Sequence, residues 1–222
     1  VVDPDDVWVV GSEGIAIHWD GANWRDYDSK SSNNLQALWG ASSEAVWASG
    51  EWGVISFWDG EQWSLQQSSL DNIRYYLSLF GTDSQSVYAV GETGIASDGI
   101  LHWNGEAWSE VRDGLLAVHP FFSIWGSSGN DIWAGGLWGL LRHFDGHSWS
   151  RADFEDWSIV DLWGRNSSQV WAIGSFGDIA KWNGSLWTPQ AFVPLEFLFA
   201  ITGDPEHVFI AGEGASVLTG PP

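Results

Sequence analysis

The sequence predicts an all-β protein, a β-propeller built from four-stranded antiparallel blades of about forty residues each. Three observations lead to this fold class. A short hairpin pattern returns six times along the 222 residues, glycine (27) and tryptophan (19) are far above ordinary usage, and no segment sustains a helical period. Six blades are expected, with five blades or part of a larger ring as the alternatives.

The repeat is defined by an aromatic residue that follows the first Val or Ile of each copy. These aromatics are spaced by 39, 41, 45, 38 and 38 residues. The copies read VWVVGSEGIAIHWDGANW (7–24), VWASGEWGVISFWDGEQW (46–63), VYAVGETGIASDGILHWNGEAW (87–108), IWAGGLWGLLRHFDGHSW (132–149), VWAIGSFGDIAKWNGSLW (170–187) and the truncated VFIAGEGASVLTG (208–220).

The second copy contains all four expected strands in order. LQALWG (35–40) is an apolar strand, AVWAS is the next, and a bend at Gly50 and Gly53 leads to VISFW. Asp59-Gly60 then forms a tight turn into QWSLQ, because Asp and Gly tolerate the positive φ that such hairpins require. Each blade is therefore expected to run from an inner to an outer strand.

The first and last copies are incomplete. The first lacks most of its first strand, and the last stops after its third, which could also let two chains join through these ends as a homo-oligomer. We expect one domain over 1–222 with repeat units at 1–34, 35–76, 77–121, 122–158, 159–197 and 198–222.

Composition narrows the class of partner. The chain carries 29 acidic residues against 8 Lys and Arg, a formal charge of −21, so nucleic acid is not an expected partner. There is no cysteine for disulfides or thiolate metal sites, and no apolar run is long enough to insert into a membrane. The absence of methionine suggests a mature or trimmed chain, and we expect a bacterial extracellular or periplasmic setting.

The VWAVG-like strands, the Gly-x-x-Gly bend and the D/N-G-x-x-W turn resemble the repeats of Asp-box and YCF48-type propellers. The Asp-box pattern is S-x-D-x-G-x-x-W, whereas this chain has an aromatic two places before the glycine, as at Trp58 and Trp103. The Trp-rich repeats are also loosely similar to tachylectin and tectonin lectins. These resemblances imply the fold, while propellers host many unrelated activities.

Sixteen of the nineteen tryptophans occupy four repeated slots: before the strand-one glycine, after the strand-two Val or Ile, before D/N-G, and at the end of G-x-x-W. A residue required at the same place in every blade is most simply a packing residue. The alternative is a ligand pocket in each groove between blades, built from the same tryptophans and the Asp or Asn.

The aromatics outside the repeated slots are the predicted ligand-binding residues. They lie at the bend between strands two and three, or in the connection from strand four to the next strand one, and both should emerge on one face. The predicted set is Trp52, Trp138, Phe176, Trp157, Tyr75 and Tyr76.

Catalysis and metal binding have weaker support in the sequence. Sialidase-type hydrolysis needs convergent arginines, and only six arginines exist. Histidines recur before the strand-three aromatic at His18, His102 and His143, a slot expected to face the surface. We predict no catalytic residues and no cofactor, although the acidic segments 3–6 and 153–156 could hold a structural calcium ion.

The functional hypothesis is a secreted, non-enzymatic propeller that binds a carbohydrate through aromatic loops on one face. A protein-interaction or assembly scaffold, as YCF48-type proteins are, is the alternative. A glycoside hydrolase ranks third.

Overall fold

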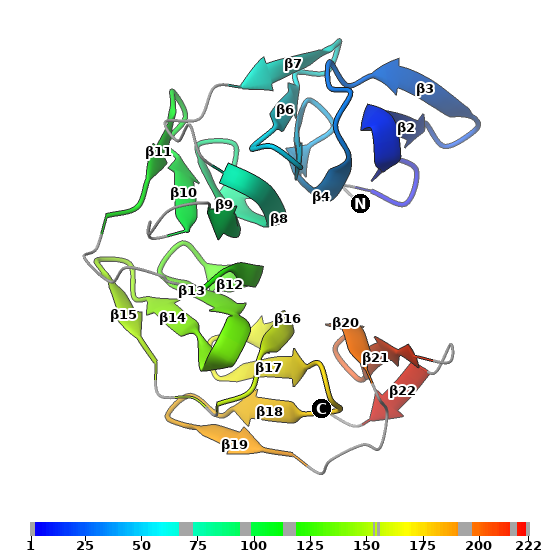
Figure 1. Ribbon diagram of the computed structural model, residues 1–222. Coiled ribbons are helices and arrows are strands. Elements are labelled where there is room, and N and C mark those ends of the chain that lie inside the picture. The colour runs from blue at the N-terminus through cyan, green and yellow to red at the C-terminus, as the bar shows by residue number, and fades with distance from the viewer. Residues whose placement is uncertain are drawn as a thin grey trace. The chain divides into compact units, whose positions relative to one another are not determined.

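The computed structural model describes residues 3–66, 73–93, 99–112, 119–152, 154, 156–190, 197–213 and 217–220 (Figure 1). These residues form six antiparallel sheets, four with four strands and two with three. The all-β prediction and the four-stranded repeat are confirmed. The chain divides into two compact units, Val1–Val118 and His119–Pro222, which are described separately.

Unit 1 holds sheets 1 to 3 in chain order. Their strands are β1 (Val7–Val10), β2 (Ile15–Trp19) and β3 (Trp24–Asp28); β4 (Leu35–Ser42), β5 (Ala45–Gly50), β6 (Ile55–Trp58) and β7 (Trp63–Gln66); β8 (Ile73–Asp83), β9 (Ser86–Thr93), β10 (Ile100–Trp103) and β11 (Trp108–Glu110).

Unit 2 holds sheets 4 to 6. Their strands are β12 (Phe121–Ser128), β13 (Asp131–Gly136), β14 (Leu141–Phe144) and β15 (Trp149–Arg151); β16 (Ile159–Asn166), β17 (Gln169–Gly174), β18 (Ile179–Trp182) and β19 (Trp187–Pro189); β20 (Leu198–Gly203), β21 (Val208–Gly212) and β22 (Val217–Gly220).

The two three-stranded sheets are the ones that the sequence marks as incomplete. Sheet 1 begins at β1, which carries Trp8 and is equivalent to β5, the second strand of sheet 2. Sheet 6 ends at β22, which is equivalent to β6, the third strand of sheet 2. The prediction of one domain over the whole chain stays a prediction.

The D/N-G turns between strands three and four have a structural cause. Gly60 has a φ of 96°, which a side chain would disfavour. Asp59 accepts hydrogen bonds from the backbone N–H groups of Gln62 (2.8 Å) and Glu61 (2.9 Å), and these bonds lower the pKa of the Asp59 carboxyl. The Asp or Asn of the repeat is therefore used in closing the turn.

The Trp-Gly pair of strand one joins successive sheets within each unit. A Cβ on Gly81 would lie 2.6 Å from the ring of Trp39, one sheet earlier in the chain. Gly164 meets Trp125 at 2.6 Å and Gly203 meets Trp163 at 2.5 Å in the same way. Glycine is needed at these positions because the tryptophan of the preceding sheet covers its backbone and leaves no room for a β-carbon.

The core lies between facing sheets. Sheets 1 and 2 share a cluster around Trp8, Val46 and Trp63, and sheets 4 and 5 share one around Trp133 and Ile159. These side chains are almost completely buried. Packing is therefore the role of the repeated tryptophans at these positions.

Candidate functional site

Two tryptophans at the bends between strands two and three have an unusual backbone. Trp52 and Trp138 have φ values of 57° and 56°, in the left-handed region that costs an ordinary residue about 1–2 kcal/mol. Their side chains are nevertheless 74% and 67% exposed. Glu13 has the same φ of 56° in sheet 1, so the bend does not require an aromatic residue.

Hydrogen bonds to the following connection, or to the start of the strand after it, hold these bends in place. The Trp52 N–H donates to the Arg74 carbonyl at 2.6 Å, and the Trp138 N–H donates to the Ser158 Oγ at 3.1 Å. The Gly139 N–H donates to the Trp157 carbonyl at 3.1 Å. The bends and the strand-four-to-strand-one connections thus lie side by side, as expected, and the surrounding hydrogen bonds sustain the strained conformation.

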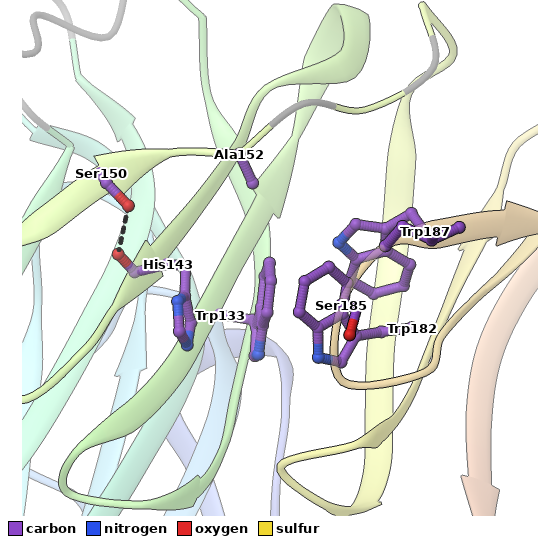
Figure 2. A pocket seen from close by; sticks show the side chains of 8 residues that line it. Trp133, His143, Ser150, Ala152, Trp182, Ser185 and Trp187 are labelled. Atoms are coloured by element: carbon purple, nitrogen blue, oxygen red, sulfur yellow. Dashed lines mark hydrogen bonds between the residues drawn. The ribbon is translucent and has the colours of Figure 1, made fainter.

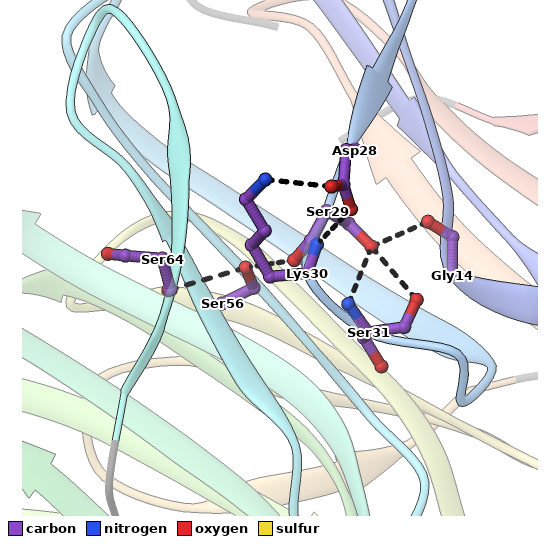
Figure 3. A network of polar contacts seen from close by, with 7 residues as sticks. All are labelled: Gly14, Asp28, Ser29, Lys30, Ser31, Ser56 and Ser64. Atoms are coloured by element: carbon purple, nitrogen blue, oxygen red, sulfur yellow. Dashed lines mark hydrogen bonds and ion pairs between the residues drawn. The ribbon is translucent and has the colours of Figure 1, made fainter.

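The corresponding bend of sheet 1 is held by a serine network (Figure 3). Ser29, which is buried, donates from its Oγ to the Gly14 carbonyl at 2.6 Å. The hydroxyl of Ser56, in sheet 2, donates to the Ser29 carbonyl at 2.6 Å. The bend is therefore tied both to its own sheet and to the next one.

Unit 2 adds a group of exposed phenylalanines near its bends. Phe176, the third predicted bend residue, is 66% exposed, and its ring lies 5.6 Å from that of Phe197. Phe197 and Phe199 are themselves exposed and were not predicted. Phe197 ends the Pro-rich connection 188–197, which the sequence places on the same face as the bends, and Phe199 follows it on β20.

The other three of the six predicted residues are less exposed than the aromatics at the bends. Tyr76 is wrong as a ligand contact in this structure, because it is 1% exposed and packs in the core between sheets 2 and 3. Its neighbour Tyr75 is half-buried on β8. Trp157 is also half-buried, since its ring covers Gly174 and contacts Phe154 at 4.7 Å.

The strand-three histidines do not simply face the surface. His18, His102 and His143 are half-buried and stack on Trp8, Tyr88 and Trp133 of their own sheets, with ring centroids 4.1–4.4 Å apart. At this slot, Phe57 packs on Trp47, and Lys181 lies over the ring of Trp171 at 4.6 Å. The residue types interchange because each can cover an aromatic face.

Asp131 shows how one such histidine is oriented. Its carboxylate lies 2.7 Å from the Nε2 of His143 and accepts a hydrogen bond from Ser127. Burial alone would raise the pKa of Asp131, but the bonds from His143 and Ser127 outweigh burial and lower it. The carboxylate therefore stays charged and fixes the imidazole.

Asp161 is a buried carboxylate on β16 with a different environment. It accepts hydrogen bonds from the Ser123 hydroxyl at 2.8 Å and the Ile201 N–H at 2.9 Å, so it links sheets 4, 5 and 6. Burial raises the pKa of Asp161 above its usual range despite these donors.

Within the described ranges, no group of three or more His, Cys, Asp or Glu side chains is placed to hold a metal ion. Asp6, in the first acidic segment, is bonded to His18 at 2.7 Å, and residues 153 and 155 of the second segment lie outside the described part of the chain. Structural calcium stays a prediction.

A cavity of about 420 Å³ lies between sheets 4 and 5 (Figure 2). Three tryptophans and His143 form its walls, and small or polar side chains lie around them. The lining residues are Trp133, His143, Ser150, Ala152, Trp182, Ser185, Leu186 and Trp187.

Comparisons with solved structures decide the fold class. A structure of YCF48 bound to D1 peptide matches 97% of this chain and 74% of its own, with a TM-score of 0.71 and 17% identity. YCF48 from Cyanidioschyzon merolae matches 98% of this chain and 79% of its own, with a TM-score of 0.72 and 15% identity. The fold is a β-propeller.

A third match is the extracellular domain of the hybrid two-component system BT3049 from B. thetaiotaomicron. It covers 98% of this chain but 32% of its own, with a TM-score of 0.76 and 12% identity. No family model and no curated protein matches the sequence. The resemblance to YCF48 is confirmed at the level of fold, whereas the Asp-box and lectin resemblances stay predictions.

Among the residues that the structure describes, no helix has the length and apolar character to cross a bilayer.

Proposed function

We propose that this propeller is a non-enzymatic recognition module that binds its ligand through exposed aromatic side chains at the bends between strands two and three. The supporting observation is the pair Trp52 and Trp138, two bulky side chains held outward on a left-handed backbone. The same bend in sheet 1 carries Glu13, so the fold does not need these rings. Backbone strain around an exposed residue is typical of binding sites.

A carbohydrate is the first candidate ligand. A single indole face that is already ordered can stack on the C–H surface of a sugar without losing further side-chain entropy. Glu51 precedes Trp52 in the same bend, and its carboxylate accepts a hydrogen bond from Asn34 at 3.0 Å, so the bend also carries polar groups. Hydroxyl groups of a bound sugar would find donors and acceptors there.

A protein partner is the second candidate, favoured by the exposed phenylalanines of unit 2. Phe176, Phe197 and Phe199 present exposed apolar surface, which suits a polypeptide better than a sugar. The YCF48 structure with a bound peptide shows that a protein of this fold can take such a ligand. With a charge of −21, this chain would prefer a basic partner.

Binding to a glycan array, followed by isothermal titration of each positive glycan, tests the first candidate. Replacing Trp52 or Trp138 with Asn should weaken binding at least tenfold if that ring stacks on the sugar. Trp24→Ala is the matched control, because Trp24 is a half-exposed tryptophan at the opposite end of its sheet, beside the turn between strands three and four.

The outcomes separate the candidates. Binding that survives both bend variants would refute the role of the bends. No glycan binding, together with capture of a basic peptide that Phe176→Ser abolishes, would favour the protein partner. Turnover of a fluorogenic glycoside would contradict the non-enzymatic assignment. We also propose an extracellular or periplasmic location, which fractionation of the native cells would test.

A further inference from the structure

The bends of sheets 2 and 4 share one backbone conformation. Trp52 and Trp138 have φ values of 57° and 56°, and the glycines after them, Gly53 and Gly139, have φ values of 71° and 68°. In both bends the residue before the tryptophan donates its N–H to a carbonyl just before the first strand of the same sheet, at 3.0 and 3.1 Å. Since the backbone fixes the direction of the Cα–Cβ bond, both indole side chains leave their own sheets in the same direction.

The bend of sheet 1 repeats this backbone without an aromatic side chain. Glu13 has a φ of 56° and Gly14 a φ of 72°. The glycines that enter the bends also agree, because Gly11 in sheet 1 and Gly136 in sheet 4 have φ values of −168° and −164° and the same ψ of −153°. The same bend therefore accepts either a tryptophan or a glutamate.

Phe176 belongs to a different kind of bend. Within that bend of sheet 5, the left-handed conformation is taken by Gly177, with a φ of 84°, and not by the aromatic residue. The ring of Phe176 also has an aromatic neighbour, Phe197, at 5.6 Å. The bends of sheets 3 and 6 carry no aromatic residue at positions 91–99 or 211–217. The bends thus provide two equivalent exposed indoles, Trp52 and Trp138.

These two rings suit one class of sugar best. Most of each side chain is open to solvent, and the C–H groups of a sugar are attracted to the electron-rich face of an indole. A sugar whose ring hydroxyls are all equatorial, such as β-linked glucose, directs C–H groups at both of its faces. The formal charge of −21 repels acidic sugars, so a neutral sugar is favoured.

Two equivalent sites favour a ligand that presents the same group more than once. A polysaccharide of one sugar does so at every unit, whereas the surface of a folded protein rarely presents one segment twice. A single stacked sugar binds weakly, with a dissociation constant on the order of 1 mM. A second site lets one protein molecule hold a polymer at two places or join two polymer chains.

We propose that this protein is a bivalent receptor for a neutral β-linked glucan, with Trp52 and Trp138 as separate sites for one glucose ring each. This inference rests on the recognition function proposed above and adds the class of sugar and the number of sites. Bivalency does not require both rings to reach the same polymer chain, because two sites anywhere on one molecule can hold two different chains. The protein should therefore cross-link a soluble glucan.

NMR titration with cellotetraose counts the sites, and light scattering with a soluble mixed-linkage β-glucan measures cross-linking. We expect the indole N–H signals of Trp52 and Trp138 both to shift and saturate. Trp52→Asn and Trp138→Asn should each remove one responding signal, leave the affinity of the other site unchanged and abolish cross-linking. The double variant should not bind. Trp24→Ala is the matched control, because it removes a half-exposed tryptophan outside the bends and should leave both measurements unchanged.

A gain of function keeps the test independent of these losses. Glu13→Trp places an indole on the bend of sheet 1 that has the same backbone, so it should add a third responding signal. Combined with Trp52→Asn, it should restore cross-linking. Glu13→Gln is its control and should add no signal and restore nothing.

The outcomes separate this inference from the proposed function. A response at only one of the two indoles, or glucan binding without cross-linking, would overturn bivalency. Binding of alginate, an acidic polysaccharide, as strong as that of the glucan would contradict the argument from charge. If cellotetraose and the glucan do not bind but another glycan does, and the bend variants abolish that binding, the class of sugar is wrong and the recognition function stands. Glycan binding that survives the double variant would refute both.

Discussion

Replacing Trp52 with asparagine should leave the protein almost as stable as before. About a quarter of the Trp52 side chain is hidden, since 74% is exposed. For a side chain of roughly 250 Å², that is about 65 Å², or about 1.6 kcal/mol of apolar burial lost. Asparagine tolerates the left-handed backbone, so relief of strain returns about 1–2 kcal/mol.

These opposing effects predict a change of less than about 1 kcal/mol in the free energy of unfolding. Trp52→Ala loses the same surface but keeps a strained β-carbon, so it should be less stable than Trp52→Asn by about 1 kcal/mol. By contrast, Trp47→Ala in the core should cost about 3–5 kcal/mol. The difference between the first two variants isolates the contribution of the backbone.

Urea denaturation followed by far-ultraviolet circular dichroism measures all three variants, because it does not depend on tryptophan emission. A loss above about 2 kcal/mol in Trp52→Asn would show that the ring has a structural role that the exposed fraction does not capture. Equal stability of the Asn and Ala variants would refute the argument from strain.

Three further predictions concern the interior of unit 2. Gly164→Ala should destabilise the protein by about 1–3 kcal/mol in urea denaturation, because its β-carbon would lie 2.6 Å from the Trp125 ring; an unchanged midpoint would contradict this packing. Asp161→Ala should cost about 1–3 kcal/mol in the same assay, since the backbone N–H of Ile201 and the hydroxyl of Ser123 lose their acceptor. The third is a pH dependence of opposite sign at two carboxyls, measured against Asp→Asn variants. Asp131 has a lowered pKa in the folded protein, so its carboxylate stabilises the fold above the usual aspartate pKa near 3.8, and this stability is lost as the pH falls below 3.8. Asp161 has a raised pKa in the folded protein, so its carboxylate destabilises the fold above that raised pKa, and this penalty is relieved as the pH falls from the raised pKa towards 3.8. If the Asp131→Asn and Asp161→Asn variants differed from the unmodified protein in stability with the same dependence on pH, these assignments would be refuted.

The fold could be predicted from the sequence because the repeat states it six times. Asp59-Gly60 and its copies mark the turns between strands three and four, and the spacing of the strand-two aromatics gives the number of residues in each repeat. The structure adds why the repeated residues are needed, as in the covering of Gly81 by Trp39. A glycine that serves a neighbour forty residues away has no local signature.

The candidate site was only partly predictable. Trp52, Trp138 and Phe176 stood out because the other three copies lack an aromatic at that bend, and the structure places all three side chains at the surface. Tyr76 was misassigned because β8 has register shifts on both sides of the Tyr75–Tyr76 pair, so strand alternation did not indicate which ring turns inward. The cavity between sheets 4 and 5 was not predicted because its small lining residues, such as Ala152, have no pattern in the sequence that marks them.

The Trp-over-Gly contact gives sheet 5 one outgoing and one incoming connection on the same short strand. In sheet 5, Gly164 receives the ring of Trp125, and Trp163, its immediate neighbour in sequence, covers Gly203 of sheet 6. A sheet with this dipeptide therefore carries both halves of the joint, and copying its forty residues copies the joint intact. Gene duplication, or a designed insertion of one repeat, could lengthen such a chain without inventing a new interface.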